Sequence, residues 1–118
     1  MHATESDWKL FRARIAGWQE AHMEKLNREY VELLSADGTA SEKFWALDRR
    51  IREDRRSAGV VVEMRRSVLH LNLCRLLAEG VIGLEDLDGF SDDLVGALKA
   101  HWPAGSSSDI LDGADIKK

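Results

Sequence analysis

Four histidines and one cysteine invite the hypothesis of a metal site. His70 and Cys74 are four residues apart, so both lie on one face if the segment is a helix. The other histidines are distant in sequence, and no H-E-x-x-H spacing occurs. Two ligands do not make a site, so the sequence predicts core packing here and no cofactor. A third hypothesis, a bundle that binds a small ligand or metal around His70, Asn72, Cys74 and Arg75, stays open.

Arginine is concentrated between residues 48 and 66, where guanidinium groups could contact phosphate. Six of these arginines are candidate contacts for nucleic acid: Arg49, Arg50, Arg52, Arg55, Arg56 and Arg66. Four acidic residues lie among them, several at the i, i+4 spacing of helical ion pairs, and the chain has a net charge of −4. An ion-paired, solvated helix face is therefore favoured, and a nucleic-acid-associated regulator is the alternative. The acidic segment 85–93 could also pair with these arginines.

The segment 68–77 is the most apolar part of the chain, with seven apolar residues out of ten. On a helix these would point in nearly all directions, so the segment is expected to be covered on all sides, by its own chain or by a second copy. Four polar residues in or near it, Glu63, Arg65, Asn72 and Arg75, are predicted to form a structural network, because unpaired buried polar groups are costly.

Motifs of catalysis are not evident in the sequence. It contains no G-x-S-x-G, no glycine-rich phosphate loop and no carboxylate pair whose spacing indicates an acid and a base. We therefore predict that the protein is not an enzyme.

The first predicted element is an amphipathic helix from about residue 7 to 34, with Thr4 or Ser6 as its N-cap. At about 40 Å it is longer than a compact domain of this size needs, so part of it could project toward a partner. Asp37-Gly38 ends it, and Thr39 with Glu42 has the spacing of a capping box that begins a second helix. The second helix presents Phe44, Leu47 and Ile51 on one face.

The rest of the chain is predicted to hold a third helix from about 58 to 79, capped by Ser57, and a fourth capped by Ser91. A single helical turn at 84–87 lies between them. The predicted fold is thus all-α, a bundle of about four main helices with a long N-terminal helix. Residues 1–103 are expected to form one domain and residues 104–118 a disordered tail rich in Gly, Ser and Asp.

Composition supports a single globular domain, since the 118 residues are 44% hydrophobic and 32% charged. One cysteine cannot form an internal disulfide, which favours a reducing compartment. No stretch reaches the roughly 18 apolar residues of a membrane span, and the N-terminal residues do not have the pattern of a secretion signal. These features predict a cytoplasmic protein.

Three segments, at residues 43–47, 53–57 and 63–67, read KFWAL, EDRRS and EMRRS. With them, residues 43 to 94 resemble a group of small, helical, uncharacterised bacterial proteins, to which names of the multidrug-transporter type are sometimes attached. The resemblance implies a bacterial origin and no established function. Because this chain has no predicted membrane span, it does not imply transport.

The leading functional prediction is a helical module that works by protein–protein interaction, as a homodimer. It depends on the long first helix, the apolar segment 68–77 and the absence of a catalytic motif. The predicted interface residues are Trp18, Trp45, Leu69, Leu73 and Leu76.

Overall fold

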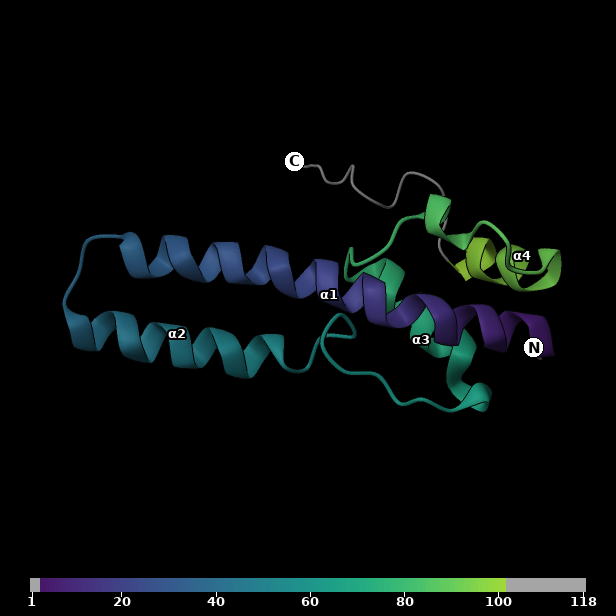
Figure 1. Ribbon diagram of the computed structural model, residues 1–118, viewed down its shortest axis with the longest axis horizontal. Helices are drawn as coiled ribbons and strands as arrows, with labels where there is room; N and C mark the ends of the chain where they lie inside the picture. The colour runs from purple at the N-terminus through teal and green to yellow at the C-terminus, as the bar shows by residue number, and fades with distance from the viewer. Residues whose placement is uncertain (1–2, 102–118) are drawn as a thin grey trace.

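The protein is an all-α bundle in a computed structural model that describes residues 3–101 (Figure 1). Its four α-helices are α1 (Glu5–Ser35), α2 (Ala40–Asp54), α3 (Leu69–Ala78) and α4 (Asp92–His101), and its two short 3-10 helices are η1 (Arg66–Val68) and η2 (Leu84–Leu87). The predicted fold class and the long first helix are confirmed. The predicted tail, 104–118, lies outside the described residues, as do the last two residues of the predicted domain.

The bundle has two parts, which we call the head and the arm (Figure 1). The N-terminal half of α1 packs with α3, η2 and α4 in the head. The C-terminal half of α1 continues away from the head and runs antiparallel to α2, and these two helices form the arm. With 31 residues, α1 is about 46 Å long, which is enough to serve both parts.

Capping boxes begin both helices of the arm. At α1, the Asp7 N–H donates to Thr4 Oγ1 at 3.0 Å and the Thr4 N–H donates to Asp7 Oδ2 at 3.3 Å. At α2, the Glu42 N–H donates to Thr39 Oγ1 at 3.2 Å and the Thr39 N–H donates to Glu42 Oε1 at 3.0 Å. Each box satisfies two backbone donors that a helix start otherwise leaves free.

The core of the head joins α1 to α3 and α4. Its largest fully buried apolar side chains are Phe11, Leu69, Leu73, Leu76, Leu94 and Leu98. On α1, the Phe11 ring stacks on Trp8 with centroids 6.1 Å apart and meets the edge of Trp18 at 6.3 Å. The prediction that segment 68–77 is covered on all sides is wrong at Leu71, which is 57% exposed. The segment buries one broad face.

The predicted third helix is only half formed, because residues 58–65 are not helical. Three consecutive valines, residues 60–62, lose side-chain freedom in a helix and disfavour it. Gly59 also lies against the ring of His22, which holds this segment to α1. Ser57, predicted to cap a helix, instead turns the chain: its Oγ accepts from the Gly59 N–H at 3.0 Å and donates to Glu79 Oε1 at 3.0 Å.

Asp7 links the start of α1 to the start of α4. Its buried carboxylate accepts from the Ser91 N–H at 2.8 Å and from Ser91 Oγ at 2.7 Å, and Ser91 Oγ in turn accepts from the Leu94 N–H at 3.3 Å. Burial opposes ionisation of this carboxyl, but the hydrogen bonds from Ser91 and Thr4 together outweigh it and hold the Asp7 pKa below its ordinary value of 3.8.

Acid is therefore expected to destabilise the fold through Asp7. Because its folded pKa lies below the unfolded value, the carboxylate stabilises the fold above pH 3.8, and this contribution is lost as the pH falls from there through the folded pKa. Urea unfolding of the wild type and of Asp7→Asn between pH 7 and pH 2.5 checks this. Asp7→Asn should be less stable at neutral pH by about 1–3 kcal/mol and should lose less stability in acid. Equal losses in acid would contradict the assignment.

In residues 3–101, the structure contains no helix with the length and apolar character needed to cross a membrane.

Candidate interaction surface

Polar contacts join the two helices of the arm. Tyr30 Oη donates to Asp54 Oδ2 at 2.6 Å, and the Arg50 guanidinium lies 2.7 Å from Glu29 Oε1 and 3.4 Å from Asp54 Oδ2. Burial and the Asp54 carboxylate raise the pKa of Tyr30 to about 12, so its hydroxyl stays a donor at neutral pH. Leu26 is the buried apolar residue of α1 at this seam.

Within the described chain, α2 has no buried residue although it carries large apolar side chains. Phe44 is 62% exposed and Trp45 is 61% exposed, and their rings meet edge to face with centroids 4.9 Å apart. Ile51 is also exposed. The prediction that Phe44, Leu47 and Ile51 share one helix face stands, but at Phe44 and Ile51 this face is open to solvent and does not belong to the core.

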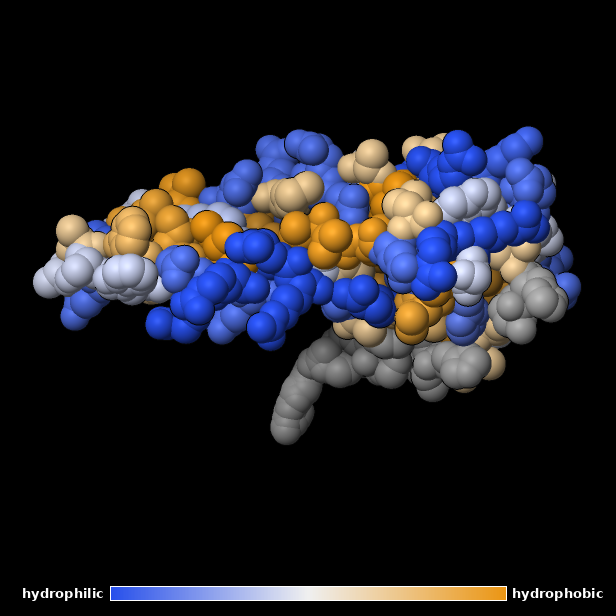
Figure 2. All heavy atoms as spheres, turned by 90° about the horizontal axis from the view of Figure 1, so that it is seen from below, coloured by the Kyte–Doolittle hydropathy of each residue, from blue (hydrophilic) through white to orange (hydrophobic). Residues whose placement is uncertain are grey.

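Apart from Trp45, the exposed large apolar residues of both arm helices fall on one side of the arm. At about 100° per residue, a rotation around α1 that starts at the residues facing α2 reaches Val31 and Leu34. A rotation in the same sense around α2, starting at the residues facing α1, reaches Ile51 and Phe44. Since the helices are antiparallel, both turns lead to the same side. We call Val31, Leu34, Phe44 and Ile51 the apolar flank. Figure 2, which views the arm from the α2 side, shows hydrophobic residues along one edge and charged residues along the other.

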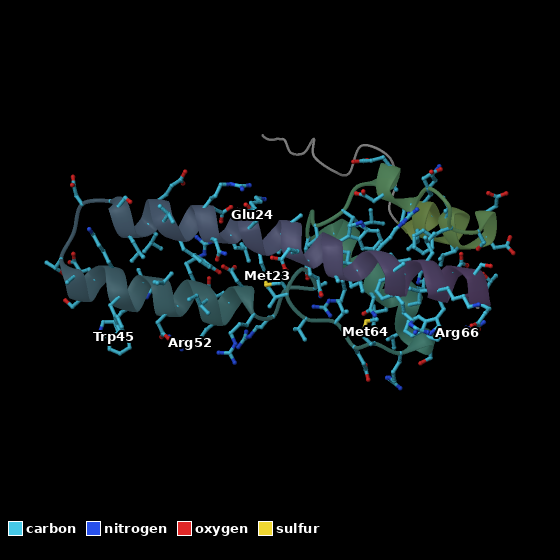
Figure 3. The ribbon with its side chains drawn as sticks, viewed as in Figure 1. Met23, Glu24, Trp45, Arg52, Met64 and Arg66 are labelled. Atoms are coloured by element: carbon cyan, nitrogen blue, oxygen red, sulfur yellow. The ribbon has the colours of Figure 1, made fainter. Side chains whose placement is uncertain are left out.

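The opposite side of the arm, which we call the charged flank, carries residues such as Lys25, Arg49 and Glu53, all exposed. Trp45 and Arg52 lie on the outer edge of α2 and point away from α1 (Figure 3). The arm therefore resembles a helical hairpin taken from a larger bundle, with one face prepared for burial and one for water.

The candidate arginines do not form one continuous basic surface. Arg50 pairs with Glu29 and Asp54 at the seam, and Arg52 pairs with Asp48 at 3.0 Å. Arg66 lies on the head, far from Arg52 (Figure 3), where it pairs with Glu5 at 2.8 Å. Arg49, Arg55 and Arg56 are exposed and form no ion pair with any residue of the described range. Three of the six candidate guanidinium groups are therefore available to contact phosphate, fewer than the sequence indicates.

The predicted interface residues lie in two different places. Leu69, Leu73 and Leu76 are completely buried in the head, so their assignment to an interface is wrong. Their apolar pattern reflects packing against the chain's own α1 and α4. Trp18 is half-buried against the same core. Trp45, beside Phe44 on the arm, is the predicted residue that remains available to a partner.

The predicted polar network is also divided. Asn72 is buried and donates to the Glu63 backbone oxygen at 2.8 Å. The side chains of Glu63 and Arg65 pair at 2.6 Å but are exposed on the segment before η1, so the prediction that they are forced inside is wrong. This error arises from the helix predicted for residues 58–65, which would have placed Glu63 and Arg65 in α3.

Arg75 belongs to a junction between arm and head that the sequence did not reveal. Its Nη2 donates to the Arg56 backbone oxygen at 2.9 Å, while Glu79 Oε1 accepts from the Ala58 N–H at 2.7 Å. From α1, Gln19 Nε2 donates to the Ala58 backbone oxygen at 3.1 Å. We call these contacts around residues 56–59 the junction clamp. A turn that receives hydrogen bonds from both α1 and α3 fixes the direction in which the arm leaves the head.

An open pocket of about 480 Å³ lies beside the junction clamp and brings together His22, Ser57 and Glu79. Ser57 Oγ lies 3.5 Å from His22 Nε2 and donates its proton to Glu79. In a hydrolytic triad the histidine must accept that proton, and the acid must orient the histidine. The three side chains therefore form a structural contact, and their hydrogen bonds do not run in the order that a nucleophilic site requires.

His70 and Cys74 meet as their spacing predicts, with Cys74 Sγ 3.9 Å from His70 Nδ1. Burial raises the pKa of the Cys74 thiol, which keeps it protonated. In the described range, no three His, Cys, Asp or Glu side chains are grouped closely enough to hold a metal ion. Asn72 and Arg75 donate to backbone oxygens, so the structure does not gather the four residues into one site.

The acidic segment 85–93 makes its contact with α1. Arg14 Nη1 donates to the backbone oxygens of Asp86 at 3.0 Å and Asp88 at 2.6 Å, and the Arg14 guanidinium lies over the Phe90 ring. Asp86 Oδ2 accepts from the Gly83 N–H at 2.8 Å. The segment thus serves the packing of the head.

Comparison of the chain with protein-family models, with curated proteins and with solved structures finds no match.

Proposed function

We propose that the protein is an interaction module that acts by binding, and that a helical partner docks on the apolar flank of the arm. The observation that carries this proposal is that α2, a helix with an apolar stripe, has no buried residue within the described chain. Isolated helices of this length are marginal in water and gain most of their stability from burying an amphipathic face. In α2, that face is the one left open.

Docking would remove a connected apolar surface from water. Phe44 and Trp45 form an aromatic pair at the arm's end, and Val31, Leu34 and Ile51 extend the surface along both helices. Aromatic side chains are enriched among the residues that dominate binding energies. Burial contributes about 25 cal/mol per Å² of apolar surface, and the ridge-and-groove surface of two antiparallel helices suits a third and fourth helix.

A photo-cross-linking amino acid at two positions of α2 tests the proposal in the cell that produces the protein. At Ile51, on the apolar flank, the probe should give cross-linked products in a yield several-fold higher than at Glu53, on the charged flank. The two positions are on the same helix and both are exposed, so accessibility to light and solvent is matched. Equal yields at the two positions, or no product at Ile51, would contradict docking on the apolar flank.

We also propose a cytoplasmic location. The chain's one cysteine, Cys74, is a free thiol with a half-buried side chain, which suits a reducing compartment. Fractionation of cells that produce the tagged protein tests this, and recovery from an oxidising compartment would contradict it.

A further inference from the structure

We propose that the occupant of the apolar flank is a second copy of this chain. Two arms would pack flank to flank into a four-helix bundle, with α1 of each copy against α2 of the other and both heads at the same end. This inference rests on the proposed function, because it names the partner of the same surface.

The two helices of the arm carry opposite charge. Residues 20–35 of α1 hold four acidic and two basic residues, whereas residues 40–56, which comprise α2 and its end, hold six basic and four acidic residues. The net charges of the two helices therefore attract each other between copies, provided that α1 of one copy meets α2 of the other. In a twofold interface each such contact occurs twice.

Charge also selects among the possible symmetries. A twofold axis parallel to the arm places α1 over the second copy's α2, so acidic residues meet basic ones. An axis across the arm would place α1 over α1 and bring like charges together, which costs free energy. The parallel axis also makes all neighbouring helices antiparallel, as in common four-helix bundles.

The register of the arm identifies a charge pair. Arg50 pairs with Glu29, and α1 and α2 run in opposite directions, so Glu24, five residues before Glu29, lies level with Arg55, five residues after Arg50. A parallel twofold axis keeps these levels and brings Glu24 of one copy to Arg55 of the other. Arg55 forms no ion pair with a residue of the described range. Glu24 has only an exposed contact with Arg28 at 3.9 Å, which such geometry makes weak.

The apolar residues match in the same register. Val31 and Leu34 are near the end of α1 that the arm shares with Phe44, so they would lie against Phe44 and Ile51 of the second copy. Closer to the head, the same side of α1 continues through Ala13, Ala16 and Gly17, and all three are exposed. A Cβ on Gly17 would meet nothing within 4 Å among the described atoms, so the head leaves this side of α1 open to a neighbour.

Analytical ultracentrifugation of the purified full chain from about 1 to 100 µM tests the proposal, in the range where typical self-association constants fall. The wild type should reach twice the 13.3 kDa of one chain. Phe44→Asp, which replaces an exposed side chain and should leave the fold intact by circular dichroism, should weaken the dimer by about a hundredfold, since each interface holds two copies of the change.

Charge reversal tests the arrangement itself. Glu24→Arg and Arg55→Glu should each weaken the dimer by about tenfold, and the double variant Glu24→Arg/Arg55→Glu should recover most of the loss. Arg49→Glu, which reverses a charge on the charged flank, is the matched control and should leave the dimer unchanged. Failure of the double variant to recover affinity would overturn the parallel arrangement.

A wild type that stays monomeric at 100 µM would overturn self-association, and so would a dimer that Phe44→Asp does not weaken. Those results are distinguishable from failure of the proposed function. Cross-links from Ile51 to a different protein would keep the docking role of the flank and exclude the second copy, whereas equal cross-linking from both flanks would reject the docking role.

Discussion

Leu73→Ala is expected to lower the free energy of unfolding by about 2–5 kcal/mol, the largest effect anticipated for a single substitution in this protein. Leu73 is completely buried where α3 packs into the head. Its truncation removes apolar contacts and leaves a cavity that the surrounding helices can close only in part. The same loss weakens the packing of the head, from which the arm projects.

Leu71→Ala is the matched control, because Leu71 is two residues away on the same helix and is 57% exposed. Its truncation should change the free energy of unfolding by no more than about 0.5 kcal/mol, as is usual for surface positions. Urea unfolding of both variants, followed by circular dichroism, measures the difference. Similar losses for the two leucines would mean that α3 is covered on all sides, as the apolar pattern alone predicts and the structure does not show.

Features that depend on neighbouring residues could be predicted from the sequence. The N-cap at Thr4, one of the two predicted for the first helix, the capping box at Thr39 and the cap at Ser91 involve hydrogen bonds over three residues, so residue types and spacing indicate them. The left-handed backbone at Gly80, with φ of 75°, ends α3 as its position predicts. These local signals gave the order of the helices and the long first helix correctly.

Features that depend on distant residues could not be predicted in this way. An apolar stripe has the same sequence pattern whether its own chain or another one covers it. The sequence therefore could not show that Phe44 on α2 is exposed while Leu73 on α3 is buried. The turn after α2 is similar: its non-helical path depends on contacts of residues 57–59 with His22 and Glu79, which are far apart in the sequence.

The junction clamp connects these observations to the proposed function. A docking arm needs a defined direction, since two flanks can meet in register only if the heads do not obstruct them. Gln19 and Arg75 donate to backbone oxygens of residues 56–58 and Glu79 accepts from the Ala58 N–H, and these hydrogen bonds supply that direction. The clamp is built from polar side chains that bond to backbone atoms, and such contacts are specific in geometry because hydrogen bonds weaken steeply when they are misaligned.

Gly59→Ala is expected to destabilise the protein by about 1–3 kcal/mol, because it forces a methyl group into a filled space. A Cβ on Gly59 would collide with His22 Cδ2 and would lie 2.5 Å from His22 Cγ. Since the Cγ atom is the root of the ring, a small rotation of the ring does not relieve the collision, and the whole side chain or the turn must move. Displacing the turn would strain its hydrogen bonds to Gln19 and Glu79.

Gly96→Ala is the control for the change of residue type. Gly96 lies within α4, and a Cβ there would meet nothing within 4 Å among the described atoms, so the substitution should stabilise by up to about 1 kcal/mol through helix propensity. Gly59→Ala should therefore lower the midpoints of thermal and urea unfolding, and Gly96→Ala should raise both. In a His22→Ala background the ring is gone, and Gly59→Ala should then cost much less. An unchanged cost in that background would show that the ring of His22 is not what makes glycine necessary at this turn.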